Sequence, residues 1–356
     1  MKKTLLTAAA LISLAGLAFS DVKLSGYVRG GASVTLDDPS VDENTYSSAT
    51  WMGGDYFGGG SRQRLVLDAS FENCGVLMRY QHDGYSDYFA DGSISWLMGY
   101  ASFCDGKVIA EAGKINDRFT WTGGFQDSAF DWWGRGKGAA LVVKPVEGLV
   151  IEADVTDLFT SEVTKGEAKA TKADADLLQV SAKYGTDSFF VTGGFAPAGY
   201  YFGSFGLMSV ENLYATVELF GETKDGNCYS NGGWAGYVSD TYNDITVFLD
   251  YSGIDKTELA LVAEATILDD CTKLKINPAV GYDLSDIIKL TADVTVNLPA
   301  SWDEDKLGAK PDTYATITPG VTFKASKAAS ATVWATISTD TDQAQNKLGA
   351  GVKLSY

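Results

Sequence analysis

The last ten residues of the chain, Lys347–Tyr356, have the sequence KLGAGVKLSY. Apolar residues occupy every even position of this stretch, and polar residues or glycines occupy every odd position. Side chains of a β-strand point alternately to opposite faces, so the alternation predicts a strand with one apolar and one polar face. An aromatic residue, Tyr356, ends the strand, whereas the ends of water-soluble domains usually fray. An apolar face for lipid, a polar face for water and an aromatic residue at the boundary predict a strand that crosses a membrane.

Long alternating stretches recur through the chain. In Val22–Leu36 the even positions are apolar or glycine and the odd positions are mostly polar. Similar stretches occupy residues 288–298, 314–324 and 330–338. Strands in water-soluble domains usually have about 5–6 residues, whereas a tilted membrane-crossing strand needs ~9–11. These lengths favour a transmembrane β-barrel over the alternative of a secreted, water-soluble β-sandwich.

The first twenty residues have the pattern of a secretory signal peptide. Lys2 and Lys3 precede an apolar core, and residues 18–20 (AFS) form a small-x-small cleavage site before Asp21. The alternative, a helical membrane anchor, needs ~20 apolar residues, which is more than this core provides. We therefore expect residues 1–20 to be a cleaved signal peptide and residues 21–356 to form one outer-membrane β-barrel.

Composition and charge narrow the possible partners. The chain has 39 glycines, only 7 prolines and 12% aromatic residues, which is typical of a strand-rich protein. Its formal net charge is −18, and removal of Lys2 and Lys3 with the leader makes it −20. So acidic a chain is poorly suited to bind nucleic acid or anionic lipid through electrostatic attraction. We therefore expect no nucleic-acid partner.

The connections between the predicted strands differ in length. Short ones, such as residues 72–75 and 285–286, alternate with long ones, such as residues 37–61 and 223–244. Short periplasmic turns and long outer loops are typical of outer-membrane barrels. The expected fold is therefore all-β, a transmembrane antiparallel up-and-down β-barrel of 16–18 strands. Pro278 and Pro319 fall inside predicted strands, where a proline removes a ladder hydrogen bond, so the local register stays open there.

The four cysteines test this topology. Cys74 and Cys104 fall at the periplasmic ends of two neighbouring predicted strands, and Cys228 and Cys271 fall in two successive outer loops. Disulfides form in the oxidising compartments outside the cytoplasm. We therefore expect Cys74 to pair with Cys104, and Cys228 to pair with Cys271.

Two segments carry a resemblance to a known family. Residues 100–114, YASFCDGKVIAEAGK, place a glycine turn before a strand that ends in Ala-Gly-Lys, and residues 144–149, KPVEGL, form a second turn. With the leader, the strand rhythm and the terminal aromatic strand, they resemble the general bacterial porins, the trimeric diffusion channels of the Gram-negative outer membrane.

The resemblance implies a constriction loop and a function. The loop after the fifth strand, about residues 116–138, would fold into the lumen and narrow it. The chain would be a homotrimer in outer-membrane lipid, forming a water-filled channel for passive diffusion of small hydrophilic solutes and ions. The barrel-assembly machinery would insert it, with Tyr356 as part of the assembly signal.

The charges of the first three predicted strands suggest how such a channel selects solutes. A pore constriction selects by its size and its electric field. Lys114, in the fifth predicted strand, is a further candidate for the constriction. Which face it takes stays open, because Lys114 and Glu111 point to opposite faces of a regular strand. The other predicted constriction cations share one polar face and would form a basic wall; they are Arg29, Arg62, Arg64 and Arg79.

The predicted constriction loop carries acidic and aromatic residues. Its carboxylates belong to Asp117, Asp127 and Asp131. As the resemblance implies, they would face the basic wall across the pore. The alternative is that they are solvated charges of the lumen with no role in selection. The rings of the loop are candidates for stacking on sugars or similar solutes, and the alternative is that they pack the loop against the wall. The rings belong to Phe119, Trp121, Phe125, Phe130, Trp132 and Trp133.

Two other functions are weighed against a channel. The long outer loops are rich in Tyr, Gly and Asn, which suits a non-channel barrel that acts as a surface adhesin or structural protein. An enzyme would need a base, and the single histidine, His82 beside Asp83, belongs to no recognisable catalytic motif. The sequence also has no metal-ligand, phosphate-loop or dinucleotide motif. We therefore expect no enzymatic activity, no cofactor and no metal.

Overall fold

The computed structural model describes most of the chain. The described residues are 21–36, 46–47, 50–52, 57, 59–60, 62–83, 93–115, 119–120, 136–156, 161–164, 167–170, 178–197, 199–222 and 242–356. The predicted signal peptide and most of the predicted constriction loop lie outside these ranges. Among the described residues, no helix combines the length and the hydropathy that a membrane crossing requires.

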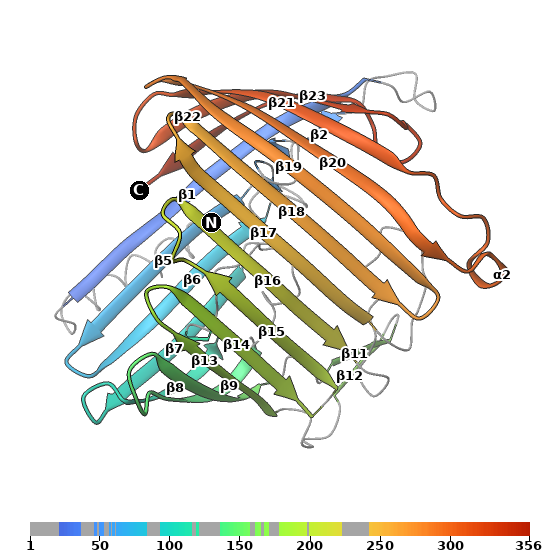
Figure 1. Ribbon diagram of the computed structural model, residues 1–356. Helices are drawn as coiled ribbons and strands as arrows, with labels where there is room; N and C mark the ends of the chain where they lie inside the picture. The colour runs from blue at the N-terminus through green and yellow to red at the C-terminus, as the bar shows by residue number, and fades with distance from the viewer. Residues whose placement is uncertain are drawn as a thin grey trace.

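The described strands form one long antiparallel sheet (Figure 1). It has 19 strands, of which β2 (Tyr46–Ser47) is a two-residue addition beside β1, so eighteen strands form the wall. The prediction of an antiparallel barrel of 16–18 strands is confirmed at its upper end. The wall strands are β1 (Asp21–Thr35), β5 (Arg62–Phe71), β6 (Cys74–Asp83), β7 (Ser93–Phe103), β8 (Val108–Ile115), β9 (Gly136–Val143), β10 (Leu149–Thr156), β13 (Leu178–Gly185), β14 (Phe189–Ala196), β15 (Tyr200–Leu207), β16 (Leu213–Glu222), β17 (Tyr242–Ile254), β18 (Thr257–Leu268), β19 (Cys271–Ser285), β20 (Ile288–Trp302), β21 (Tyr314–Lys324), β22 (Ala329–Ser338) and β23 (Lys347–Ser355).

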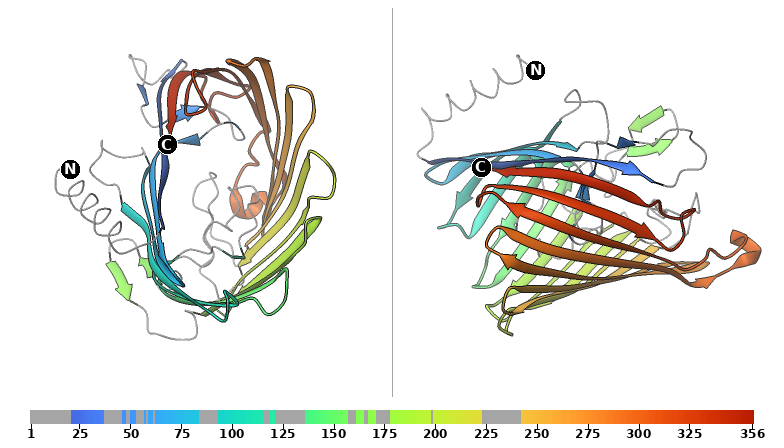
Figure 2. Two further views of the ribbon diagram at one scale, coloured as in Figure 1. Left: turned by 90° about the vertical axis from the view of Figure 1, so that its left-hand side faces the viewer. Right: turned by 90° about the horizontal axis from the view of Figure 1, so that it is seen from above.

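Two short ribbons are separate from the wall. They are formed by β3 (Thr50–Met52) with β4 (Gly59–Gly60), and by β11 (Ser161–Thr164) with β12 (Glu167–Ala170). A single-turn helix, α2 (Glu304–Leu307), lies in the connection from β20 to β21, where the side chain of Asp303 caps its N-terminus. This connection projects beyond the rim of the barrel in the right view of Figure 2.

The sheet closes because β1 pairs along both of its edges. It pairs with β5 from Asp21↔Ser70 to Arg29↔Arg62, and with β23 from Tyr27↔Ser355 to Thr35↔Lys347. The left view of Figure 2 shows the ring, with blue β1 beside the red C-terminal strand. Closure leaves no sheet edge of unpaired backbone groups facing lipid.

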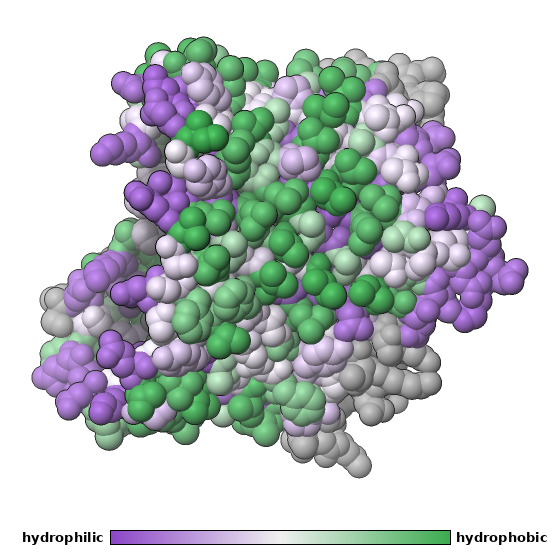
Figure 3. Space-filling model, viewed as in Figure 1, coloured by the Kyte–Doolittle hydropathy of each residue, from purple (hydrophilic) through white to green (hydrophobic). Residues whose placement is uncertain are grey.

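The two faces of the wall differ as the alternation predicts. Outward apolar side chains are about half exposed, as are Leu24 in β1, Val217 in β16 and Val352 in β23. The inward neighbours of Val217, Thr216 and Glu218, are polar and buried. Figure 3 shows the outward face as a broad green apolar surface between hydrophilic ends. The wall therefore presents apolar groups where lipid would lie and polar groups toward the lumen.

Pro278 of β19 and Pro319 of β21 each interrupt the ladder on one edge, to β20 and β22, where the pairs resume in the same register beyond the proline. The ladder on the other edge is continuous. The partners of the two prolines on that edge are Leu261 of β18 and Ala292 of β20, and neither of these two strand pairs shifts register at the proline. The lost hydrogen bonds are therefore local, and the doubt about register at these positions is resolved.

Two connections at the outer end of the barrel are short, whereas the predicted pattern has long loops at that end. Residues 197–199 join β14 to β15, and Asp269–Asp270 join β18 to β19. β17 to β20 have 12 to 15 residues each, more than the ~9–11 that cross a bilayer. The β18–β19 hairpin can therefore turn tightly in water, beyond the apolar band.

The structure describes three of the four cysteines, all as free thiols. Cys74 pairs with Ala101 in the β6–β7 ladder, and Cys104 lies three residues further, in the turn. Both thiols are exposed, and the predicted Cys74–Cys104 bond is not formed in the structure. Cys271 is the buried first residue of β19 rather than part of a loop. Its predicted partner, Cys228, lies outside the described residues.

Tyr356 closes the seam between the last strand and the first. Its N–H donates to the carbonyl of Gly26 (3.0 Å), and its carbonyl accepts from the N–H of Gly26 (3.1 Å). Its ring lies over Gly26, where a Cβ would be only 2.7 Å from the ring hydroxyl. That hydroxyl donates to the carbonyl of Arg64 in β5, 3.0 Å away. Tyr356 thus joins three adjacent strands.

Deletion of Tyr356 should impair assembly, because it removes the last rung of the seam and the ring that covers Gly26. The folded fraction, measured by heat-modifiable gel mobility after expression, should fall. Tyr356→Phe is the matched control: it keeps the ring and loses one hydrogen bond, worth ~0.5–1.5 kcal/mol. Normal assembly of the deletion variant would contradict this role for Tyr356.

Candidate functional site: the barrel lumen

Four arginines of the first three wall strands share the inward face. Cross-strand partners point to the same side of a sheet. Arg29 of β1 pairs with Arg62 of β5, and Arg64 pairs with Tyr27. Arg79 of β6 pairs with Val66 of β5. The predicted basic wall is therefore present, and β23 extends it through Lys353, which pairs with Arg29.

The ring of Tyr27 lies at the centre of this wall. The cationic groups of Arg29, Arg64 and Lys353 lie 5.8, 5.5 and 5.6 Å from its centroid. Arg64 also donates twice to the side-chain oxygen of Gln81, at 3.0 and 2.7 Å. Cations within about 6 Å of an aromatic face are attracted to it. Tyr27 therefore gathers three cations from three adjacent strands.

Arg79 occupies a more enclosed position on the same wall. Its guanidinium carbon lies 3.7 Å from the ring centroid of Trp96, and the residue is 8% exposed. Trp96 packs in turn against an inward apolar cluster that includes Leu77 and Met98. Stacking of this kind suits the planar guanidinium, so Arg79 is held by packing as well as by charge.

Carboxylates line the rest of the inner wall, and the sequence analysis did not single them out. Each of six is 0–4% exposed and lies on the inward face: Glu111 (β8), Glu152 and Asp154 (β10), Glu218 (β16), Asp244 (β17) and Asp293 (β20). The sequence does carry a signal for two of them. Glu152 and Asp154 alternate with the apolar residues Ile151, Ala153 and Val155, which predicts that both carboxylates face the lumen. The lumen therefore has a basic arc, from β23 to β6, and a longer arc rich in carboxylates.

The carboxylate-rich arc also holds lysines, which form ion pairs on the inner wall. Lys275 lies 3.3 Å from Glu264, and Lys324 lies 2.6 Å from Asp283. Lys289 pairs with Glu258. These lysines therefore offset part of the negative charge locally, whereas the basic arc gathers its cations around rings.

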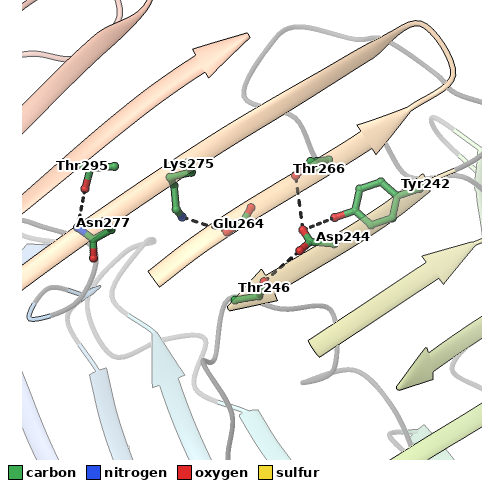
Figure 4. A network of polar contacts seen from close by, with 8 residues as sticks. All are labelled: Tyr242, Asp244, Thr246, Glu264, Thr266, Lys275, Asn277 and Thr295. Atoms are coloured by element: carbon green, nitrogen blue, oxygen red, sulfur yellow. Dashed lines mark hydrogen bonds and ion pairs between the residues drawn. The ribbon is translucent and has the colours of Figure 1, made fainter. Parts of the chain in front are cut away.

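A row of polar contacts crosses β17 to β20 (Figure 4). Asp244 accepts hydrogen bonds from the hydroxyls of Tyr242 and Thr246, both at 3.1 Å. On the far side of the row, Asn277 donates to the hydroxyl of Thr295, at 3.0 Å. Buried polar groups are stable only where they find partners; Asp244 finds them on its own strand, and Asn277 finds one on the next strand.

The chain after β8 enters the barrel. Thr120 is 1% exposed, and its hydroxyl lies 2.9 Å from that of Ser181, on the inward face of β13. The ring of Phe119 lies 4.6 Å from the ammonium group of Lys144, next to the turn between β9 and β10. The predicted inward fold of the loop after the fifth strand is thus confirmed where the structure describes it. The contact of Phe119 fits the packing interpretation of its ring.

The other predicted residues of this loop lie outside the described residues, so their roles stay predictions. They are Asp117, Asp127, Asp131, Trp121, Phe125, Phe130, Trp132 and Trp133.

Lys114 faces outward, so its inclusion in the constriction was wrong. It pairs with Leu97, whose side chain is 45% exposed, and its neighbour Ile115 is buried on the inward side. On the other edge of β8 it pairs with Lys137 of β9. Its ammonium group donates to the carbonyl of Ile94, 2.8 Å away. Glu111 takes the inward face of β8, as the period of two requires.

No assembly of catalytic or metal-binding groups stands out in the part of the chain that the structure describes. His82 lies in β6, paired with Gln63 of β5. The described residues hold no group of three or more His, Cys, Asp or Glu side chains placed to bind a metal ion.

Removal of the Ser181 hydroxyl should release the segment that enters the barrel. Ser181→Ala leaves the buried hydroxyl of Thr120 without this partner, at a cost of about 1–3 kcal/mol in the free energy of unfolding. New protease cleavage near Phe119 should appear in detergent. Ser204→Ala is the matched control, because the buried Ser204 hydroxyl has no hydrogen-bond partner among the described residues. Equal stability and cleavage in both variants would contradict the role of Ser181.

No protein-family model matches the chain. No curated protein matches it in sequence.

Solved outer-membrane proteins do share its fold. Acinetobacter baumannii OccAB1 has a TM-score of 0.57 at 12% identity, over 95% of this chain and 97% of that one. Pseudomonas aeruginosa OccK2, solved in complex with glucuronate, has a TM-score of 0.54 at 12% identity, over 95% and 98% of the two chains. The trimer form of Vibrio cholerae OmpT has a TM-score of 0.51 at 14% identity, over 94% and 99%. The likeness extends over nearly the whole of each chain and establishes the fold.

Proposed function

We propose that the chain forms a water-filled channel in the outer membrane of a Gram-negative bacterium, for passive diffusion of small hydrophilic solutes and ions. The observation that carries the proposal is the closed ring of eighteen strands with charged groups inside and apolar groups outside. A lumen of this composition holds water, because charged groups in a dry interior would be costly.

The distribution of charge supports a selective rather than a neutral pore. The basic arc faces a longer arc of carboxylates, so an electric field crosses the lumen. Such a field orients dipolar and ionic solutes in the narrow part of a pore. The cations around Tyr27 suit a carboxylate-bearing solute, a class to which the glucuronate bound by OccK2 belongs.

The proposal extends to the partners of the barrel. We propose a homotrimer in outer-membrane lipid, inserted by the barrel-assembly machinery; V. cholerae OmpT is a solved trimer of the same fold. The outward face of β8 and β9 carries small residues, Ala110, Ala112 and Ala139, which let two walls approach closely. We also propose that the chain is not an enzyme and needs no cofactor. A surface adhesin is the rival function, and it requires no open lumen.

Single-channel recording in a planar bilayer tests the channel directly. The purified, refolded barrel should produce discrete conductance steps that scale with salt concentration, because ions cross a water-filled lumen. The control is the heat-denatured protein at the same detergent concentration. A folded barrel without conductance steps would favour the adhesin or structural role.

Neutralising one inward cation should change ion selectivity. Arg64→Gln removes a charge from the group around Tyr27, so the reversal potential in a salt gradient should shift toward cation preference. Lys114→Gln removes an equal charge from the outward face and is the matched control. The shift should be larger for Arg64→Gln. Equal shifts in both variants would contradict the assignment of the lumenal face.

A further inference from the structure

Phe57, a residue of the connection between β1 and β5, also contacts the inner wall. The backbone N–H of Phe57 donates to a side-chain oxygen of Asp293, 3.1 Å away. Asp293 lies on the inward face of β20 and is 1% exposed. The bond joins two residues 236 positions apart in the sequence, so it fixes Phe57 to the inner wall.

The ring of Phe57 fits a recess in the wall. It packs against Trp334 of β22, which is 2% exposed, and lies 5.2 Å from the ammonium group of Lys289. Trp334 covers Gly349 so closely that a Cβ there would be 2.2 Å from the indole ring. A Cβ on Gly281 would be 3.3 Å from the tip of the Phe57 ring. Glycines on both sides therefore leave the space that the two rings occupy.

Asp293 is held on the wall as well as bound to Phe57. Its second side-chain oxygen accepts a hydrogen bond from Asn277, which is fully buried. Asn277 also donates to the hydroxyl of Thr295 (3.0 Å) and to the carbonyl of Val294 (2.9 Å). One carboxylate thus links the wall to the inserted chain. Hydrogen bonds to an ionised group are the stronger kind.

The two inserted segments attach to opposite parts of the ring. Thr120 attaches to β13, whereas Phe57 attaches to β20 and β22, which are seven and nine strands further around a ring of eighteen. The ribbon strand β3, which precedes Phe57 in the chain, lies close to β1, β22 and β23. It therefore lies beside the strands that carry Arg29 and Lys353.

We propose that β3 and Phe57 form a second constriction element of the pore, and that Asp293 is the residue that positions it. This inference deepens the proposed channel function and rests on it. The segment narrows the lumen from the side opposite Thr120 and borders the basic arc. Solutes then pass between two inserted segments, not past one.

Conductance and solute size test the proposal. Phe57→Ala removes the ring from its recess without changing the wall, and Asp293→Ala removes the anchor. Both variants should raise single-channel conductance and admit larger sugars in liposome-swelling assays. The double variant should match the larger single effect, because both changes release the same segment. Asp244→Ala is the matched control: it removes an inward carboxylate of β17, three strands away from Asp293 of β20.

An independent measurement separates this proposal from the channel proposal. Hydrogen exchange at the amide of Phe57 should be slow in the wild type and roughly ten- to hundred-fold faster in Asp293→Ala, as the loss of a hydrogen bond to a charged group implies. Asp244→Ala should leave the exchange rate at Phe57 unchanged. Slow exchange in a barrel that does not conduct would support the docked segment and contradict the channel.

Two results would overturn the second constriction. One is a Phe57→Ala variant with the conductance and solute cut-off of the wild type. This variant stays informative even if Asp293→Ala fails to fold, because Phe57 lies outside the wall strands. The other is fast exchange at Phe57 in the wild type.

Discussion

The pairing of β1 with both β5 and β23 is the constraint on which the rest of the molecule depends. Backbone N–H and C=O groups that face lipid find no water, so each must be paired within the protein. A sheet of eighteen strands satisfies this condition only when its first and last strands meet. Tyr356 strengthens that seam, because it bonds to β1 through its backbone and to β5 through its hydroxyl.

Closure of the sheet separates an outward face, which is apolar, from an inward face, which is lined by polar and charged side chains. The inward carboxylates are tolerated because nearby hydroxyls supply donors, as Tyr242 and Thr246 of the same strand do for Asp244. The same inner wall receives chain from outside the sheet. Ser181 hydrogen-bonds to Thr120, and Asp293 accepts a hydrogen bond from the backbone of Phe57. Buried polar groups thus serve two purposes, since they satisfy one another and they bind residues from outside the sheet to the inner wall.

Much of the architecture could be read from the period of two. The inward placement of Arg29, Arg62, Arg64 and Arg79 follows from parity alone and is confirmed. Parity also placed Lys114 opposite Glu111, but it could not say which of the two faced the lumen. The pairing of Lys114 with the exposed Leu97 decides this. The strand count stayed between 16 and 18 because tight outer turns, such as residues 197–199, have no long loop to mark them.

The sequence by itself determined the class of fold, the closing strands and, where polar and apolar residues alternate without a break, the face on which each strand residue lies. These properties depend on local alternation and on the number of residues needed to cross a bilayer. Only the tertiary structure decided which inward groups meet, because such contacts join residues far apart in the chain. The gathering of three cations around Tyr27 is one example, and the docking of Phe57 on Asp293, 236 residues away, is another. Hydrogen bonds and ring contacts of this kind form only after closure has brought the strands to fixed positions around the lumen.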